Sequence, residues 1–260
     1  MRHLFYSLFA LLTCSLLVAG CSSTPTYNPT VFDYQIDQER LAQSRVKTVV
    51  IPHVNLGGPS RNYLQKEEAR IDGMVATYLK EQGYTVLPQR RFTQHWNNAV
   101  RAFGDPVEPT TGRVNMKTFA QIMQSVRDQM AQEGKLDAFV FTDLVEVEVA
   151  FAGGLKHLAR WDGVTRKPSL QGPGDGVSID FDWNAPAAAA SLQVAIFDME
   201  LKRLFFSRGG LDATDAIDTR SSGGRYTRRR NMLENEDHLL EGIQLALHPF
   251  IVMDRWPGNP

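Results

Sequence analysis

The sequence predicts an α/β (α+β) domain in which helices pack on a mixed β-sheet. Three patterns indicate this fold class: an opening β-α-β unit at residues 46–88, a later long strand at residues 138–151, and a β-hairpin at residues 192–206. Short apolar runs that end at proline or glycine are typical of strands, whereas apolar residues every three or four positions indicate helices. Of the 260 residues, 43% are hydrophobic and 22% are charged, which is typical of a folded globular chain.

The opening unit starts with the apolar run at residues 49–51, which Pro52 closes as a strand end. A helix is expected next, because Asn62 is followed three residues later by a glutamine in a capping-box pattern and apolar residues then recur on one face. Gly83 ends this helix. Residues 84–87 then predict a second strand, so the first two strands flank one helix.

Two more helices are expected before the long strand. The aromatic and apolar stripe between residues 92 and 103 predicts one helix, which ends at Gly104. Residues 105–113 contain two prolines and a glycine and therefore predict a loop. Asn115 is a candidate N-cap for the next helix, which Gly134 ends.

The long strand begins with the apolar run at residues 138–141, which indicates burial on both faces, and continues as an apolar and polar alternation to residue 151. Residues 152–186 and 211–231 are rich in glycine and polar side chains and are expected to be loop insertions. A last helix is expected from about Glu234 towards Pro249. It should bury Leu239, Leu240, Ile243 and Leu247.

The first residues carry the pattern of an export signal. A basic start at Arg2 precedes an apolar run over residues 4–19, and small residues stand directly before Cys21. Polar residues interrupt this run, which is shorter than a membrane-spanning helix needs to be. The stretch Leu16–Cys21 resembles a bacterial lipobox, and the resemblance implies cleavage after residue 20 and acylation of Cys21. The alternative is an ordinary secreted protein with a cysteine near the cleavage point.

The lipoprotein resemblance also implies a plan for the chain. Residues 1–20 are a cleaved signal peptide, residues 21–45 are a lipidated cysteine and flexible tether, residues 46–254 are one periplasmic domain, and residues 255–260 are a tail. Fully extended, the tether would reach at most about 80 Å. By family analogy, Ser22 favours the outer membrane, with the domain facing the periplasm.

The strand and helix pattern from residue 46 to residue 88, with the strand at residues 137–147 and the hairpin at residues 194–206, resembles a broad class of envelope lipoproteins. That class includes the curli-secretion channel lipoproteins, the amino-terminal domain of Tol translocation proteins and activators of peptidoglycan synthases. The resemblance implies a sheet backed by helices and a role in envelope assembly or transport.

Catalytic signatures are missing from the sequence: it contains no His-Glu-x-x-His zinc helix, no Gly-x-Ser-x-Gly elbow, no phosphate loop and no Cys-x-x-Cys pair. No cofactor or metal is therefore expected. Asp180 and Asp182 do not complete a calcium shell, and the acidic residues near His238 are typical of a helix N-terminus. The net charge of −1 does not indicate a nucleic-acid partner.

Two groups of side chains are candidate contacts. If the first three strands are parallel, His53, Arg90, Arg91 and Asp143 lie near their carboxyl ends, where open sheets bind ligands, and they form a candidate anion site. Solvation and helix capping are the alternative explanation for them.

The second group is the basic cluster Arg225, Arg228, Arg229 and Arg230, on a segment expected to be a flexible loop. These arginines are candidate contacts for anionic lipid, lipopolysaccharide phosphate or an acidic protein. The alternative is a charge run that only stays solvated.

These observations favour a lipid-anchored periplasmic envelope protein that acts as a non-enzymatic binding or assembly module. Its expected partners are the membrane, through Cys21, and an envelope protein, and the sequence does not indicate an oligomeric state. One alternative is a subunit of an outer-membrane secretion channel, and another is a cell-envelope hydrolase.

Overall fold

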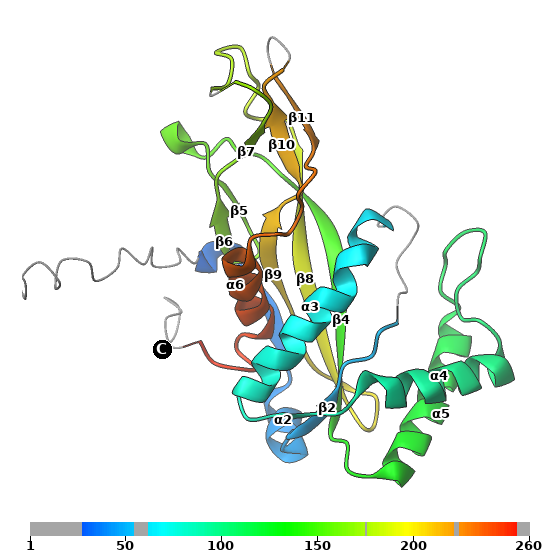
Figure 1. The fold of residues 1–260 in the computed structure, drawn as a ribbon. Helices are drawn as coiled ribbons and strands as arrows, with labels where there is room; N and C mark the ends of the chain where they lie inside the picture. The colour runs from blue at the N-terminus through cyan, green and yellow to red at the C-terminus, as the bar shows by residue number, and fades with distance from the viewer. Residues whose placement is uncertain (1–27, 55–61, 175, 221–223, 254–260) are drawn as a thin grey trace, which may run out of the picture.

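The computed structural model describes residues 28–54, 62–174, 176–220 and 224–253. Its centre is a six-stranded sheet in the order β1-β9-β8-β4-β2-β3, in which β2 runs parallel to β3 and β4 and the other neighbours are antiparallel (Figure 1). The strands are β1 Tyr34–Ile36, β2 Thr48–Val50, β3 Thr85–Val86, β4 Ala138–Val149, β8 Ala187–Asp198 and β9 Arg203–Ala213. The predicted mixed sheet, its parallel opening strands, the long strand and the hairpin are confirmed.

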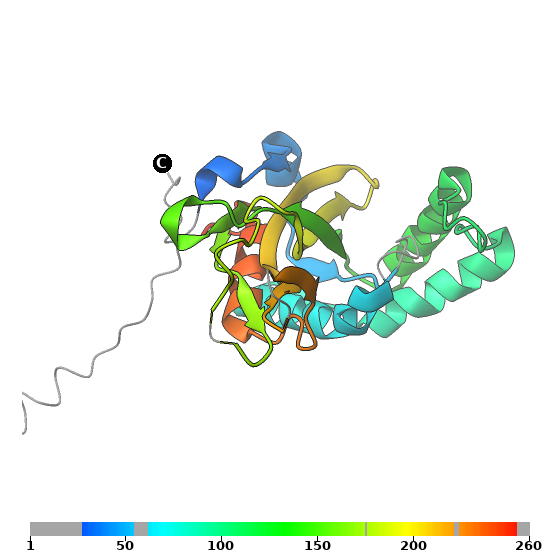
Figure 2. The same ribbon diagram turned by 90° about the horizontal axis from the view of Figure 1, so that it is seen from above.

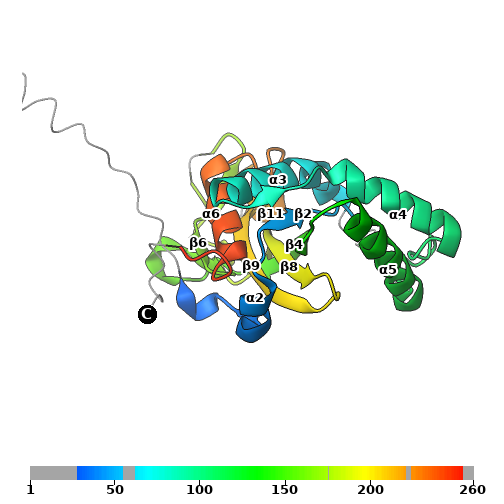
Figure 3. The same ribbon diagram turned by 90° about the horizontal axis from the view of Figure 1, so that it is seen from below.

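One face of this sheet is covered by α3 (Asn62–Glu81) and α6 (Glu236–Leu247), which lie on the same side of the strands in Figure 3. Their buried stripes form the main core with the inward side chains of β4, β8 and β9. Apolar burial of this kind is the dominant stabilising contribution to a fold. In α6, Leu239, Ile243 and Leu247 are buried as predicted, whereas the prediction for Leu240 is wrong because this side chain is 42% exposed.

On the opposite face, one end of the sheet is covered by α4 (Gln89–Phe103) and α5 (Met116–Glu133). These helices pack against each other and against Val50 and Phe139, and they extend away from the sheet as an arm (Figures 1 and 2). The predicted helix bounds are confirmed. The Asn115 side chain accepts hydrogen bonds from Lys117 N and Thr118 N, so it is the N-cap that the sequence predicted.

The predicted tether at residues 21–45 is too long. Residues 28–45 belong to the fold: η2 (Pro29–Val31) leads into β1, an edge strand of the main sheet, and α2 (Gln38–Ser44) follows. The side chain of Arg40 donates to Asp198 Oδ2 at 2.9 Å and thereby joins α2 to the turn between β8 and β9. Three-residue elements leave too little periodicity to be seen in a sequence, and residues 21–27 lie outside the described residues.

The two expected loop insertions also contain regular structure. Within residues 152–186 lie η4 (Gly154–Lys156), the hairpin of β5 (Ala159–Trp161) with β6 (Val164–Arg166), and β7 (Ser169–Gln171). Within residues 211–231, β10 (Asp215–Asp218) pairs with both β7 and β11 (Arg225–Arg228). A second apolar core beneath these strands contains Phe151, Ala159, Trp161, Val164, Ala189, Ala213 and Leu245. The sequence analysis missed these strands because each has only three or four residues, although β5 and β6 form a local hairpin across Asp162 and Gly163.

Candidate functional site

The candidate anion site at the carboxyl ends of the parallel strands is only partly assembled. His53 and Asp143 line one small cavity there, of about 20 Å³, which holds about one water molecule. Arg90 and Arg91 are exposed in the first turn of α4 and do not line this cavity. The structure therefore brings together two of the four predicted residues.

Two carboxylates that the sequence prediction missed complete this cavity. Glu68 and Asp72 lie one helical turn apart on α3, so that both face the end of the sheet. His53 Nδ1 lies 3.0 Å from Asp72 Oδ2, and Thr142 Oγ1 donates to Asp72 Oδ1 at 2.6 Å. The cavity is lined by three carboxylates and one imidazole. The hypothesis of an anion site is therefore wrong, because the lining is mainly acidic. The i, i+4 spacing of Glu68 and Asp72 was the available signal.

A histidine held by a carboxylate is one part of a general acid–base arrangement. In this cavity the other ring nitrogen, His53 Nε2, lies 4.0 Å from Glu68 Oε2. The contacts of His53 and Thr142 with Asp72 instead tie β2, α3 and β4 together. Among the described residues, no three His, Cys, Asp or Glu side chains are grouped as metal ligands, and Asp180 and Asp182 lie exposed in turns.

A larger hollow lies on the helical arm. It is an open groove of about 400 Å³ between α4 and the segments at residues 53–54 and 105–107. Phe92 and Trp96 stack in its floor with ring centroids 5.8 Å apart, and Val100 continues the apolar surface along the helix. Asn97 and Asp105 add polar groups to the lining. We call this hollow the arm groove. Its floor is aromatic, and polar groups make up much of its exposed lining.

The basic cluster predicted at residues 225–230 is divided by the structure. Arg228, in β11, lies 3.1 Å from Glu146 Oε2 and 3.4 Å from Asp215 Oδ1, and its guanidinium stacks 4.0 Å above the Tyr63 ring. Arg225 and Arg230 are exposed at either end. The expectation of a flexible loop is therefore wrong for residues 225–228, because β11 is a paired strand and Arg228 meets carboxylates from β4 and β10.

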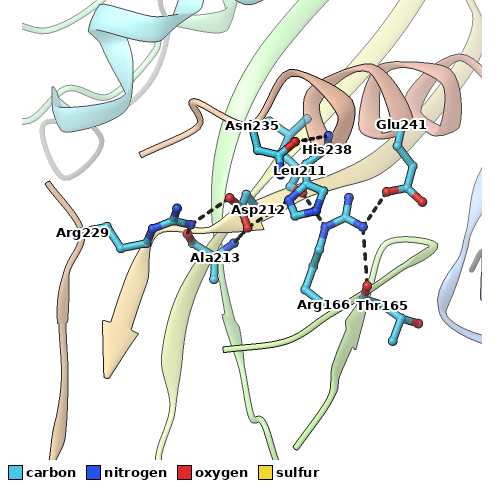
Figure 4. Close-up of polar contacts among 9 residues, drawn as sticks. All are labelled: Thr165, Arg166, Leu211, Asp212, Ala213, Arg229, Asn235, His238 and Glu241. Carbon is cyan, nitrogen blue, oxygen red and sulfur yellow. Dashed lines mark hydrogen bonds and ion pairs between the residues drawn. The ribbon is translucent and has the colours of Figure 1, made fainter. Parts of the chain in front are cut away.

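Arg229, the fourth member, joins a buried ionic network beneath α6 (Figure 4). Arg229 Nη1 donates to Asp212 Oδ2 at 2.8 Å, and His238 Nδ1 lies 3.5 Å from Asp212 Oδ1. Burial alone raises the pKa of Asp212, but His238 and Arg229 outweigh burial and hold this pKa below its ordinary value. His238 thus faces a carboxylate on β9 and not the acidic residues of its own helix turn.

The same view shows a second buried pair, Arg166 with Glu241 (Figure 4). Arg166 Nη1 lies 2.5 Å from Glu241 Oε2, and Arg166 Nε donates to the carbonyl oxygen of Leu211 at 3.0 Å. This pair joins β6 to α6, just as the Asp212 network joins β9 and the segment after β11 to α6. A buried ion pair contributes less to the free energy of unfolding than its contacts suggest. Removing one partner is nevertheless costly, because it leaves the other charge buried and unpaired. We assign both networks a structural role.

The fold and these sites define an α+β domain that carries a groove with aromatic side chains in its floor on a helical arm. Comparison of the chain with protein families, with curated proteins and with solved structures found no match in any of the three. None of the helices in the described part of the chain has the length and apolar character needed to cross a membrane. Cys21, the predicted lipidation site, lies outside the described residues.

Proposed function

We propose that this protein is a lipid-anchored, periplasm-facing protein of the outer membrane that acts as a non-enzymatic binding module. The observation that carries the proposal is the stretch Leu16–Cys21, an apolar run and small residues directly before a cysteine. The anchor would hold the domain at the membrane surface and raise its effective concentration for partners located there.

The position where the fold begins supports this proposal. Asn28 stands seven positions after Cys21, and its backbone N–H donates to the carbonyl oxygen of Gly163 at 2.8 Å. Seven residues span at most about 25 Å, so a lipid on Cys21 would keep the start of the domain within that distance of the bilayer. The domain would stand much nearer to the membrane than a tether of residues 21–45 would allow.

The arm groove is the surface that we propose for the protein partner. The α4–α5 arm lies on the side of the molecule opposite to the start of the described chain (Figures 1 and 2). A domain anchored through Cys21 would therefore hold the groove away from its anchored end. The groove floor, formed by Phe92, Trp96 and Val100, suits an apolar segment of another envelope protein, because buried aromatic side chains supply much of the binding energy at interfaces.

The anchor is tested with the full chain expressed in a bacterial host. The intact mass of the membrane fraction should show a chain that begins at Cys21 and carries acyl groups, and the Cys21→Ser variant should lose this modification and leave the membrane fraction. An unmodified cysteine, or a wild-type chain that remains in the cytosol, would contradict the anchor.

The groove is tested in the same cells with a photo-crosslinking residue. At Asn97, an exposed position in the groove lining, we expect one discrete crosslinked product that disappears in the Val100→Asp variant. Gln124, exposed on α5 and not part of the groove lining, is the matched control and should give no such product. Identical products from both positions would contradict binding at the groove.

A further inference from the structure

A surface formed by η4 and the β5–β6 hairpin combines an exposed leucine with basic side chains. It consists of Leu155 and Lys156 on η4, Arg160 on β5, and Lys167 directly after β6. We call this surface the hairpin tip. We propose that the hairpin tip contacts the bilayer directly, with Leu155 in the interfacial region and the three basic side chains against anionic lipid headgroups. This inference rests on the proposed acylation of Cys21.

The backbone places this surface close to the anchor. Gly163, in the turn between β5 and β6, accepts a hydrogen bond from Asn28 N and donates one to the carbonyl oxygen of Val31. The first described residues therefore lie against the hairpin that carries the hairpin tip. Figure 1 shows η2, β5 and β6 at one end of the molecule and the α4–α5 arm at the other. An anchor within about 25 Å of Asn28 brings this end towards the bilayer.

The leucine is presented on an ordered support. Gly153 and Leu158 exchange two backbone hydrogen bonds, of 3.1 and 3.3 Å, across the base of η4. The His157 ring stacks on Trp183, with centroids 3.5 Å apart and an angle of 10° between the planes. The side chain of Leu155 is nevertheless 101% exposed. A single exposed leucine is ordinary on a protein surface, so its place beside the anchor and the charge around it carry the argument.

The surrounding charge is complementary to an anionic surface. Lys156, Arg160 and Lys167 are exposed, and none of them forms an ion pair with any residue that the structure describes. Asp162 is half-buried and accepts a hydrogen bond from Ser191 Oγ at 2.6 Å, whereas Asp182 is exposed next to Trp183, whose ring stacks on His157. Basic residues at a membrane surface are attracted to anionic lipids, and an apolar side chain adds to this attraction when it enters the interface.

The test uses the lipidated chain, purified in detergent and reconstituted into vesicles that contain an anionic phospholipid. An environment-sensitive fluorophore is attached to Leu155→Cys, whose thiol is unique because the thiol of Cys21 is acylated. We expect its emission to move to shorter wavelength and to lose most of its intensity when quenchers are placed on the lipid acyl chains. Met116→Cys, at an exposed position on the arm, is the matched control and should show neither change.

The charge is tested by combining Lys156→Glu, Arg160→Glu and Lys167→Glu with the fluorophore at position 155. Each basic residue near an anionic membrane changes the binding equilibrium by about fivefold. We therefore expect the ratio of molecules with a membrane-contacting hairpin tip to molecules with a free one to fall at least tenfold. Reversing the charge of the exposed Arg225 and Arg230 should have little effect. Vesicles without anionic lipid should give the same loss of contact.

Vesicle flotation of the same samples separates the two proposals. Protein that floats with the vesicles but shows no quenching at position 155 would overturn the membrane contact and leave the anchor intact. Protein that does not float, and whose mass shows an unmodified Cys21, would overturn the anchor and the contact together. Equal quenching at positions 155 and 116 would also contradict a specific contact of the hairpin tip.

Discussion

Individual buried polar side chains in this protein take partners that lie far away in the sequence. Asp212 is 5% exposed and meets Arg229 from the segment after β11 and His238 from α6. A carboxylate in such a place stabilises the fold only because the opposite charges stay beside it. Its removal leaves the Arg229 guanidinium partly buried without a counter-charge, which costs more than the loss of an exposed ion pair.

The Asp212→Ala variant should therefore lose about 3 kcal/mol of unfolding free energy, measured by urea denaturation at neutral pH. The exposed pair of Arg127 and Asp128 offers a matched control, because Asp128→Ala should change the same quantity by less than about 1 kcal/mol. Equal losses in the two variants would show that the buried network gives no special stability.

His248 gives the stability a dependence on pH. Burial lowers the pKa of the His248 imidazole, and a backbone hydrogen bond at Ile251 opposes this only in part. The folded state thus favours the neutral ring. The contribution of His248 to the unfolding free energy is therefore fully present above the ordinary histidine pKa of about 6.5 and is lost as the pH falls through the lowered pKa.

We expect the unfolding free energy to fall as the pH is lowered from about 6.5. The His248→Gln variant should show a shallower fall over the same range, because glutamine cannot take up a proton there. Urea titrations at a series of pH values measure both slopes. Parallel curves for the two proteins would mean that His248 is not responsible.

The packing of α6 on β9 depends on glycine at the point of contact. A Cβ atom added at Gly209 would lie 2.0 Å from the carbonyl oxygen of Gly242 and 2.6 Å from the backbone nitrogen of Ala246. Both obstacles are backbone atoms, which cannot move without shifting the helix. α6 and β9 can approach each other this closely because Gly209 and Gly242 have no side chains.

Gly209→Ala should destabilise the protein by at least about 2 kcal/mol, because overpacking a close backbone contact displaces α6 from the sheet. Gly73 is the control: it lies exposed within α3, and an added Cβ meets nothing within 4 Å. Gly73→Ala should stabilise the protein by about 0.5–1 kcal/mol through helix propensity. Thermal unfolding measures both, and a neutral Gly209→Ala variant would contradict the close contact.

Length decides which elements could be predicted from the sequence. The helices α3, α4 and α5 and the strands β4 and β8 have enough turns or alternations to show a period, and they were predicted. Strands of three or four residues such as β5, β10 and β11 show no period, and they form because the chain around them supplies partners and a second apolar core. For β7, β10 and β11 that information is distributed over distant residues, whereas Asp162-Gly163 between β5 and β6 was a local hairpin signal that the sequence analysis missed.

The candidate sites follow the same rule. The position of His53 and Asp143 at the strand ends could be predicted, because chain order and parallel strands determine it. The charge of the cavity was missed, because the i, i+4 spacing of Glu68 and Asp72 does not by itself show that these carboxylates lie at the strand ends. The arginine cluster could be recognised in the sequence. Its ion pairs, from Arg228 to Glu146 and Asp215 and from Arg229 to Asp212, depend on strand pairings that the sequence does not indicate.

The two ends of the described chain meet in the fold. The rings of Phe32 and His248 lie with centroids 5.8 Å apart, and Phe32 packs on the second core together with Met253. β1 completes the edge of the main sheet on β9. The segment at residues 28–45 is therefore part of the cooperative unit, and a flexible linker could extend no further than the residues between Cys21 and Asn28.

Two deletions in the lipidated protein distinguish this arrangement from a tether at residues 21–45. Removal of residues 24–27, which belong to the proposed tether, should leave the unfolding temperature unchanged. Removal of residues 28–45 should cost about 3 kcal/mol or more, since it takes away β1, exposes apolar surface under Phe32 and leaves the buried Asp198 carboxylate without Arg40. For a domain of this size, that loss lowers the unfolding temperature by roughly 6–12 °C. Equal unfolding temperatures for the two deletions would mean that residues 28–45 behave as a tether after all.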